Sequence, residues 1–214
     1  GGRDGRHAGT VVGWAALGGL VGARLMSILE EFSLFLHNPW GALLSTGGFS
    51  WYGGLILGAA AVLGAVWRLG LPLRRVADAT AIPLTVGYAF GRGGCQLAGD
   101  GCYGLPTNLP WGMAYPDGVV PTVVRVHPTP LYEILQCGLI ILCLMGLRRR
   151  LPRDGQLFGL YLILTALARF LVELIRLNPH LALELTASQW VAIALFALGL
   201  ALLCGGRGHG EEKI

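Results

Sequence analysis

Six apolar segments divide the chain, each close to the length of about 20 residues that a helix needs to cross a bilayer. They cover residues 7–29, 51–67, 76–91, 131–147, 156–175 and 187–204. Of the 214 residues, 54% are hydrophobic and only 13% are charged, about half the charged fraction of a soluble domain. The sequence therefore predicts an all-α, polytopic transmembrane bundle with about six spanning helices, forming a single integral membrane domain over residues 1–214.

Basic residues concentrate in alternate connections between these segments. Eleven of them fall on one side of the predicted membrane: Arg3, Arg6, Arg68, Arg74, Arg75, Arg148, Arg149, Arg150, Arg153, Arg207 and Lys213. The opposite side holds Arg125 and the edge residues Arg92 and Arg176. By the positive-inside rule, both termini and the 205–214 tail are cytoplasmic and the Gly/Pro-rich 92–130 loop is external. The net charge of +4 thus indicates topology rather than a nucleic-acid surface.

The longest polar interruption is residues 91–116, GRGGCQLAGDGCYGLPTNLPWGMAYP. A loop held by a rigid scaffold is a common place for binding and catalytic residues. Asp100 is the one carboxylate between Arg92 and Tyr115. It either forms a turn between Gly99 and Gly101 or orients an arginine or a nucleophile, and the sequence favours neither role.

Ionisable residues inside membrane segments cost several kcal/mol and need a reason. Six are predicted in the outer half of the bundle: Arg24, Arg92, Glu133, Arg169, Glu173 and Arg176. Arg169, Glu173 and Arg176 have the spacing of one helical face, which fits an internal salt-bridge ladder. Four arginines exceed two glutamates, so an anion should complete the group. Lipid phosphate is the anion that a membrane protein meets in bulk, and arginine binds it through parallel N–H groups.

Several residues have both a structural and a functional interpretation. Tyr52 follows Trp51 as an aromatic residue at a membrane interface would, yet it also adjoins Gly53 and Gly54. His127 either carries a proton or caps a turn, and the structural role is favoured. Small residues four apart predict close helix packing, with a backbone cleared for a lipid head group as the alternative. These pairs are Gly18/Gly22, Gly54/Gly58 and Gly87/Gly91.

The five cysteines form neither a CxxC pair nor a His/Cys cluster with zinc spacing, so no metal site is expected. Cys137, Cys143 and Cys204 lie in apolar runs, as small packing residues do. Cys95 and Cys102 lie in the central stretch. They could pair if this stretch faces an oxidising compartment, but unpaired thiols are favoured.

Several motifs, in this order, resemble the prolipoprotein diacylglyceryl transferases. They are GARL at 22–25, YGGLI at 52–56, GRxG at 91–94, YGLPTNLPWGMAYP at 103–116, HPTPLYE at 127–133 and ARFLVE at 168–173. The resemblance covers roughly residues 18–176, and the motifs are specific jointly rather than singly. Family members usually have seven helices with an external N-terminus, so six helices with an internal N-terminus resemble a divergent member lacking the first helix.

The resemblance implies an activity. Such enzymes transfer a diacylglyceryl group from phosphatidylglycerol to the lipobox cysteine thiol of preprolipoproteins, a step of lipoprotein biosynthesis. Glycerol phosphate leaves, and neither a metal nor a cofactor is used. The site faces the external side of the cytoplasmic (inner) membrane.

The resemblance also assigns residues. Arg92 matches the phosphatidylglycerol-binding arginine of the family signature, Arg169 matches a second essential arginine, and Glu173 matches its neighbouring glutamate. We expect catalysis by Arg92, Arg169, Asp100 and Tyr52. Substrate binding is expected of Arg92, Arg24, Gly53, Gly54, Glu173, His127, Tyr132 and Glu133.

The chain departs from the family pattern around Asp100. The signature commonly reads Gly-Arg-x-Gly-Asn-Phe-x-Asn-Gly-Glu, whereas Cys95, Gln96 and Ala98 stand here for Asn, Phe and the second Asn. Asp100 replaces the glutamate, and many members have histidine where Tyr52 stands. Two alternatives follow from these departures: a phospholipid head-group transferase with another acceptor, and a non-catalytic lipid-binding membrane protein.

Overall fold

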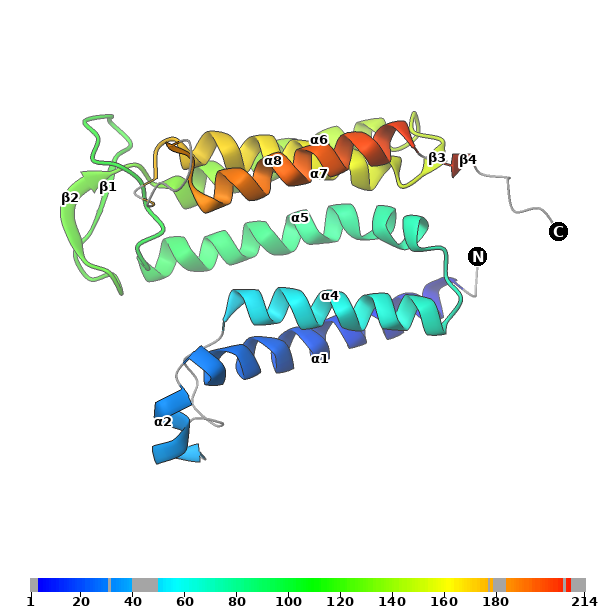
Figure 1. Ribbon diagram of the computed structural model, residues 1–214. Coiled ribbons are helices and arrows are strands. Elements are labelled where there is room, and N and C mark those ends of the chain that lie inside the picture. The colour runs from blue at the N-terminus through cyan, green and yellow to red at the C-terminus, as the bar shows by residue number, and fades with distance from the viewer. Residues whose placement is uncertain are drawn as a thin grey trace. The chain divides into compact units, whose positions relative to one another are not determined.

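The computed structural model describes residues 4–30, 32–39, 50–176, 178, 184–205 and 207–208 (Figure 1). All six predicted segments are helical. The helices are α1 (Asp4–Glu30), α2 (Phe32–His37), α4 (Trp51–Arg68), α5 (Leu73–Ala98), α6 (Thr129–Leu147), α7 (Gln156–Glu173) and α8 (Ala187–Cys204). The chain divides into two compact units, residues 1–76 and 77–214, and each is described by itself.

Four helices in the described part of the chain are long and apolar enough to cross a membrane. They lie at Gly9–Glu30, Thr129–Leu147, Gln156–Glu173 and Ala187–Cys204, while the apolar part of α4, Gly53–Arg68, is shorter. Leu135, Leu139 and Leu142 share one face of α6 and are 69%, 68% and 68% exposed, as a lipid-facing stripe would be. The all-α, multi-pass membrane class is thus confirmed, and membrane crossing by α4 and α5 stays a prediction.

In the first unit, α1 packs closely against α4 through glycines. A Cβ atom added at Gly18 would lie 2.8 Å from the carbonyl oxygen of Leu57. Gly22 and Gly53 each face the other's backbone in the same way. Close packing therefore accounts for the paired glycines Gly18/Gly22 and Gly54/Gly58 and for Gly53. Gly87 and Gly91 differ, because a Cβ there meets no described atom within 4 Å, so the packing interpretation does not extend to them.

In the second unit, α5, α6, α7 and α8 run alongside one another (Figure 1). Ala81, Ile140 and Leu144 form the buried core that joins α5 to α6. The start of α5 is tied to the start of α7, because the Asp78 carboxylate accepts the backbone N–H groups of Gly155 and Phe158, both at 2.7 Å. These hydrogen bonds fix the position of α5 along the axis of the bundle, and therefore also the position of Arg92 near the other end of α5.

A close glycine contact also joins α7 to α8. A Cβ atom added at Gly199 would lie 2.7 Å from the carbonyl oxygen of Gly159. The two backbones therefore approach each other as small residues at a helix crossing allow. The sequence reasoning did not single out this pair, because each glycine stands alone in its apolar helix.

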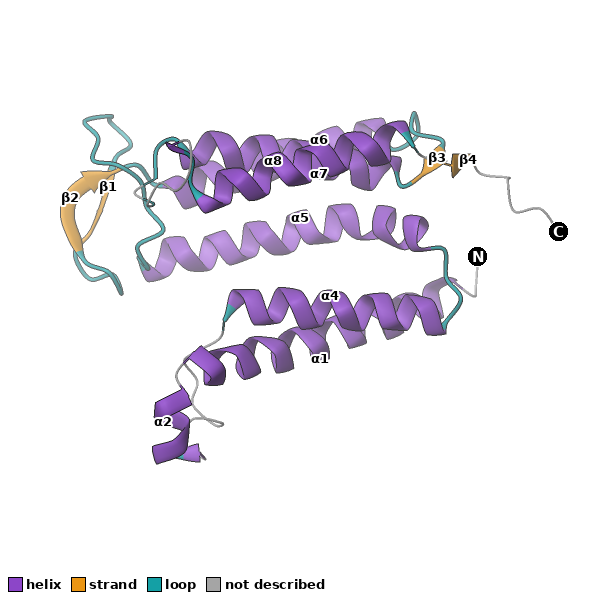
Figure 2. Cartoon of the chain, viewed as in Figure 1, coloured by secondary structure: helices purple, strands orange, loops and turns teal. Residues whose placement is uncertain are grey.

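The predicted 92–130 loop begins later than expected, because α5 continues through Arg92 to Ala98. The helix ends where Gly99 adopts φ +56° and its N–H bonds to the carbonyl of Cys95 at 3.0 Å, a glycine termination. The loop then forms an antiparallel hairpin of β1 (Met113–Tyr115) and β2 (Thr122–Val126). Figure 2 shows this hairpin at one end of the second unit and the strand pair β3–β4 at the other.

The β3–β4 pair joins Arg153–Asp154 to Arg207–Gly208. Part of the predicted cytoplasmic tail is thus held against the α6–α7 connection. Residues 206 and 209–214 of that tail lie outside the described residues, as does most of the predicted 30–50 loop.

Candidate active site

Glu133, near the start of α6, is the centre of an ionic network in the second unit. Its side chain is 3% exposed. The carboxylate oxygen Oε1 accepts the Tyr88 hydroxyl at 2.6 Å and Nη1 of Arg169 at 3.0 Å. The other oxygen, Oε2, lies 3.2 Å from Nε of Arg92. One buried carboxylate therefore binds both arginines that were predicted to be catalytic.

Arg92 makes three kinds of contact. Besides its ion pair with Glu133, its guanidinium lies 4.8 Å from the centre of the Tyr88 ring, within the range of a cation–π contact. Its Nη1 lies 3.6 Å from Sγ of Cys102 and 4.0 Å from Sγ of Cys95. Sulfur is a weak acceptor, so a phosphate oxygen would be a stronger partner for this nitrogen.

Tyr88 was not among the predicted site residues. It precedes Arg92 by four positions, which places the two on one face of α5. That spacing was the available signal, but the partner Glu133 is 45 residues further along the chain.

Arg169 also bridges to a second carboxylate. Its Nη2 donates to Oε2 of Glu173 at 2.7 Å and to Oγ of Ser188 at 3.1 Å. The other oxygen of Glu173 accepts Nδ2 of Asn178 at 2.6 Å and Oγ1 of Thr186 at 2.8 Å. The Glu173 side chain is 0% exposed, and three partners, Glu133, Glu173 and Ser188, hold Arg169 in place. This confirms the predicted Arg169–Glu173 salt bridge.

Arg176 does not continue the ladder, so the prediction of one shared helical face was wrong for this residue. The α-helix ends at Glu173, and Arg176 forms an antiparallel bridge with Gly104 instead. The carbonyl of Ile175 accepts the N–H of Leu105 at 2.8 Å, so the 104–105 segment draws the chain away from the helix axis. Nη1 of Arg176 is buried without a hydrogen bond in the described part of the chain.

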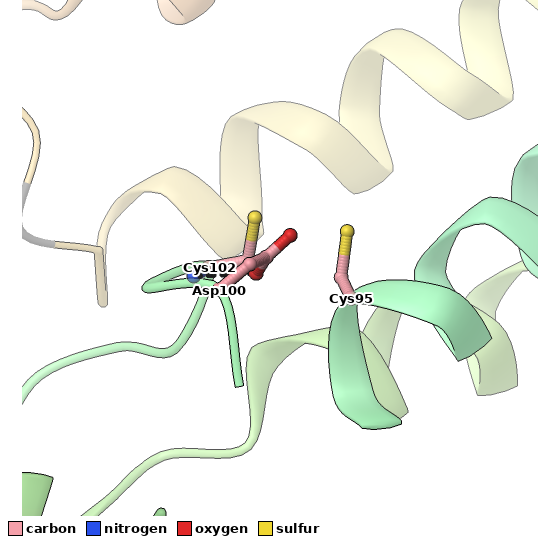
Figure 3. A group of neighbouring side chains, drawn as sticks. All are labelled: Cys95, Asp100 and Cys102. Atoms are coloured by element: carbon pink, nitrogen blue, oxygen red, sulfur yellow. Dashed lines mark hydrogen bonds between the residues drawn. The ribbon is translucent and has the colours of Figure 1, made fainter. Parts of the chain in front are cut away.

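Asp100 forms the predicted turn and gathers two thiols around it. Its Oδ1 accepts the backbone N–H of Cys102 at 3.1 Å. Figure 3 shows the carboxylate between the sulfur atoms of Cys95 and Cys102, with Cys95 on the last turns of α5. Burial alone raises the pKa of the Asp100 carboxyl, but hydrogen bonds from Cys95 and Cys102 and the charge of Arg92 outweigh it and hold this pKa below its usual range.

Cys95 and Cys102 are free thiols, which confirms the prediction that they are unpaired. One donor atom from each of Cys95, Asp100 and Cys102 lies within 4.8 Å of the others, an arrangement that could hold a metal ion. The sequence reasoning missed this group because the spacing of the two cysteines matches no zinc motif. The fold brings them together through the turn at Gly99 and Gly101, where φ is +56° and +84°.

His127 and Tyr132 form a second polar group with Trp111. The Tyr132 hydroxyl lies 3.1 Å from Nδ1 of His127 and accepts the indole N–H of Trp111 at 2.8 Å. The backbone of His127 pairs with Gly104 and Leu105. These contacts give His127 the structural role favoured from the sequence, and a role in proton transfer or substrate binding stays a prediction.

Four predicted site residues belong to the first unit. Gly53 and Gly54 lie in the α1–α4 contact, which accounts for them without a ligand. Arg24 is half-buried in α1. Tyr52 lies in the first turn of α4, and its side chain is outside the described residues. Their roles in the site stay predictions.

The fold and the network define a multi-pass helical membrane protein with an arginine–carboxylate group at one end of a helix bundle. The sequence model of the prolipoprotein diacylglyceryl transferase family matches residues 3–204. The chain therefore belongs to this family, as its motifs predicted.

Several curated relatives carry the name phosphatidylglycerol–prolipoprotein diacylglyceryl transferase. The protein of Paenarthrobacter aurescens is 34% identical over 211 residues, covering 90% of this chain and 66% of its own length. That of Streptomyces avermitilis is 34% identical, covering 100% of this chain and 65% of its own length. That of Clostridium tetani is 29% identical, covering 86% and 74%. The chain thus spans just under two thirds of the first and second of these proteins.

Proposed function

We propose that this protein transfers the diacylglyceryl group of phosphatidylglycerol to the cysteine thiol of a lipobox-containing preprolipoprotein, with release of glycerol phosphate. The observation that carries the proposal is the joint anchoring of Arg92 and Arg169 by Glu133. Two guanidinium groups fixed at one end of an apolar bundle form a binding site suited to a lipid phosphate. The names of the relatives support both substrates.

In the proposed reaction, the thiolate of the acceptor attacks the glycerol carbon that bears the phosphate ester. A carbon–sulfur bond forms, the carbon–oxygen bond breaks, and its electron pair leaves with glycerol phosphate. Negative charge grows on the phosphate oxygens, and Arg92 and Arg169 stabilise it. Their side chains are only 17% and 24% exposed, so these contacts are strong. Asp100 assists by keeping Arg92 close to the turn that it forms.

The reaction is proposed to take place at the external face of the cytoplasmic membrane. The network lies at the hairpin end of the second unit, while Arg148, Arg149, Arg150 and Arg153 lie at the other end of its helices. Basic residues mark the cytoplasmic side. The exposed apolar face of α6 provides the surface along which a lipid substrate would approach from the bilayer.

Retention of a lipid without chemistry is the competing function. The observation behind it is Tyr52, which stands where the family pattern commonly has histidine, because tyrosine is a poor base at neutral pH. Glu133 and Glu173 already pair with Arg92 and Arg169, which weakens the attraction of these arginines for an anion in either function. Catalysis requires that the growing charge on the phosphate compete successfully with these carboxylates. The two functions differ in whether glycerol phosphate is released.

The test is release of labelled glycerol phosphate from phosphatidylglycerol vesicles by the purified protein, with a lipobox peptide or its Cys-to-Ser analogue. Release only with the cysteine peptide supports the proposal. Arg92→Ala and Arg169→Ala should each lower the rate by about 100- to 1000-fold. Arg153→Ala, exposed at the other end of the unit, should leave it unchanged. Lipid binding without release establishes the lipid-binding function, and release that is independent of the peptide cysteine establishes another acceptor.

A further inference from the structure

Tyr88 supplies one of the two hydrogen bonds that Glu133 accepts in the described part of the chain. Its hydroxyl donates to Oε1 at 2.6 Å, and Nη1 of Arg169 donates to the same oxygen at 3.0 Å. The other carboxylate oxygen, Oε2, is buried and lies 3.2 Å from Nε of Arg92 without a hydrogen bond. Tyr88 is therefore the neutral donor in a group whose other two partners are arginines.

Glu133 depends most on this donor when the arginines act on a phosphate. The carboxylate is 3% exposed, so water cannot replace a partner that turns away, and a buried charge without partners is strongly unfavourable. Once Arg169 turns toward a phosphate, the Tyr88 hydroxyl is the one hydrogen bond to Glu133 that remains among the contacts of the described residues. It then faces a less neutralised carboxylate, and hydrogen bonds to charged acceptors are the stronger ones.

The two arginines differ in how easily they can take up a phosphate. Nη1 of Arg92 faces two thiol sulfurs, at 3.6 and 4.0 Å, and sulfur is a weak acceptor that a phosphate oxygen can displace. Both Nη atoms of Arg169 already donate to oxygen atoms, at 2.7 to 3.1 Å. Its Nη1 is directed at Glu133, the carboxylate shared with Arg92, so this is the contact that a phosphate between the two arginines would replace.

We propose that Tyr88 is a positioning residue, whose hydroxyl keeps Glu133 hydrogen-bonded while Arg169 turns to the leaving phosphate. This inference rests on the proposed function. The phosphodiester of phosphatidylglycerol carries one negative charge, and the departing glycerol phosphate gains a second. The demand on Arg169 therefore arises in the transition state. An interaction that strengthens only there raises kcat and leaves KM unchanged.

Tyr88→Phe isolates the hydroxyl, because phenylalanine keeps the ring whose centre lies 4.8 Å from the Arg92 guanidinium. Tyr88 is 41% exposed, so the substitution opens no buried cavity and the protein should fold. In the release assay with a lipobox peptide, kcat should fall about 10-fold, the smaller effect of losing a hydrogen bond to a charged group, and KM for phosphatidylglycerol should not change. Tyr161→Phe, which removes a hydroxyl from α7 beside the core, is the matched control and should change neither constant. A change confined to KM, or no change at all, overturns the proposal.

The action of Tyr88 through Arg169 is tested with a double-substitution cycle. Arg169→Lys removes the guanidinium fork that the hydroxyl is proposed to release. In a protein that already carries Arg169→Lys, Tyr88→Phe should therefore change kcat by less than about 2-fold, the spread expected of independent effects. The same 10-fold loss in both backgrounds would show that the hydroxyl acts independently of Arg169, and would overturn the proposal.

Binding of glycerol phosphate separates this inference from the proposed function, because its second negative charge draws on Arg169 without any chemistry. Its Kd, measured by calorimetry, should rise about 10-fold in the Tyr88→Phe protein, while the Kd of phosphatidylglycerol should not change. A wild-type protein that shows this difference but never releases glycerol phosphate would support the role of Tyr88 and refute the proposed function. Peptide-dependent release, with equal kcat and equal Kd for Tyr88→Phe and the wild type, would overturn the role of Tyr88 and leave the proposed function intact.

Discussion

Replacing Glu133 by glutamine should destabilise the second unit strongly. The substitution keeps an acceptor for the Tyr88 hydroxyl but removes the charge that Arg92 and Arg169 share at 3.2 and 3.0 Å. Removing one partner of a buried ion pair costs about 3–5 kcal/mol. Glu133 is 3% exposed, so water cannot replace it. For a chain of this size, such a loss should lower the unfolding temperature by about 6–20 °C.

The measurement is thermal unfolding in detergent, followed by circular dichroism. Asp117→Asn is the control, because it removes an exposed carboxylate from the hairpin and should change stability by less than about 0.5 kcal/mol. Phosphatidylglycerol should raise the unfolding temperature of the Glu133→Gln protein more than that of the wild type, since a lipid phosphate can replace the lost charge. Equal unfolding temperatures for Glu133→Gln and Asp117→Asn would refute the central role of Glu133.

Three further outcomes follow from the same contacts. Arg169→Lys keeps the charge but loses the guanidinium fork that bridges Glu133 and Glu173, so glycerol phosphate release should fall about 100-fold; an unchanged rate would contradict this. Gly199→Ala overpacks the α7–α8 contact and should destabilise the protein by about 1–3 kcal/mol, whereas Gly138→Ala, which meets open space, should stabilise it by up to about 1 kcal/mol. Thr186→Ala removes the side-chain cap of α8 and should lower the free energy of unfolding by about 0.5–2 kcal/mol. Thr186→Ser keeps the hydroxyl and should lower it clearly less; equal losses would contradict a capping role for the hydroxyl.

The ends of the elements were the part of the fold that the sequence predicted least well. Arg92 was expected at the start of a loop, but α5 continues to Ala98 because no residue within α5 adopts the left-handed conformation that ends the helix at Gly99. Arg176 was expected on α7, but its backbone pairs with Gly104. The end of α5 depends on the single turn at Gly99, and the end of α7 depends on a segment that is distant in the sequence.

The sequence predicted most residues of the candidate site but not the contacts between them. Arg92, Glu133, Arg169 and Glu173 were named because a charge in an apolar segment needs a reason. Tyr88 was not, since tyrosine in a membrane helix is unremarkable until its hydroxyl is seen to lie 2.6 Å from a buried carboxylate. The roles of the site residues in binding and catalysis stay predictions until the substitutions are measured.

The sequence by itself determined the class of this protein: helices, their approximate places, the membrane and the family. Hydrophobicity is a local property that adds up along a segment, and motifs are read in order, so neither needs a three-dimensional structure. The tertiary structure decided which polar groups meet. Glu133 lies 36 residues from Arg169, and Cys95 and Cys102 meet only through a turn with two left-handed glycines. Such contacts depend on how the helices pack and on where they end, and no local sequence pattern specifies either.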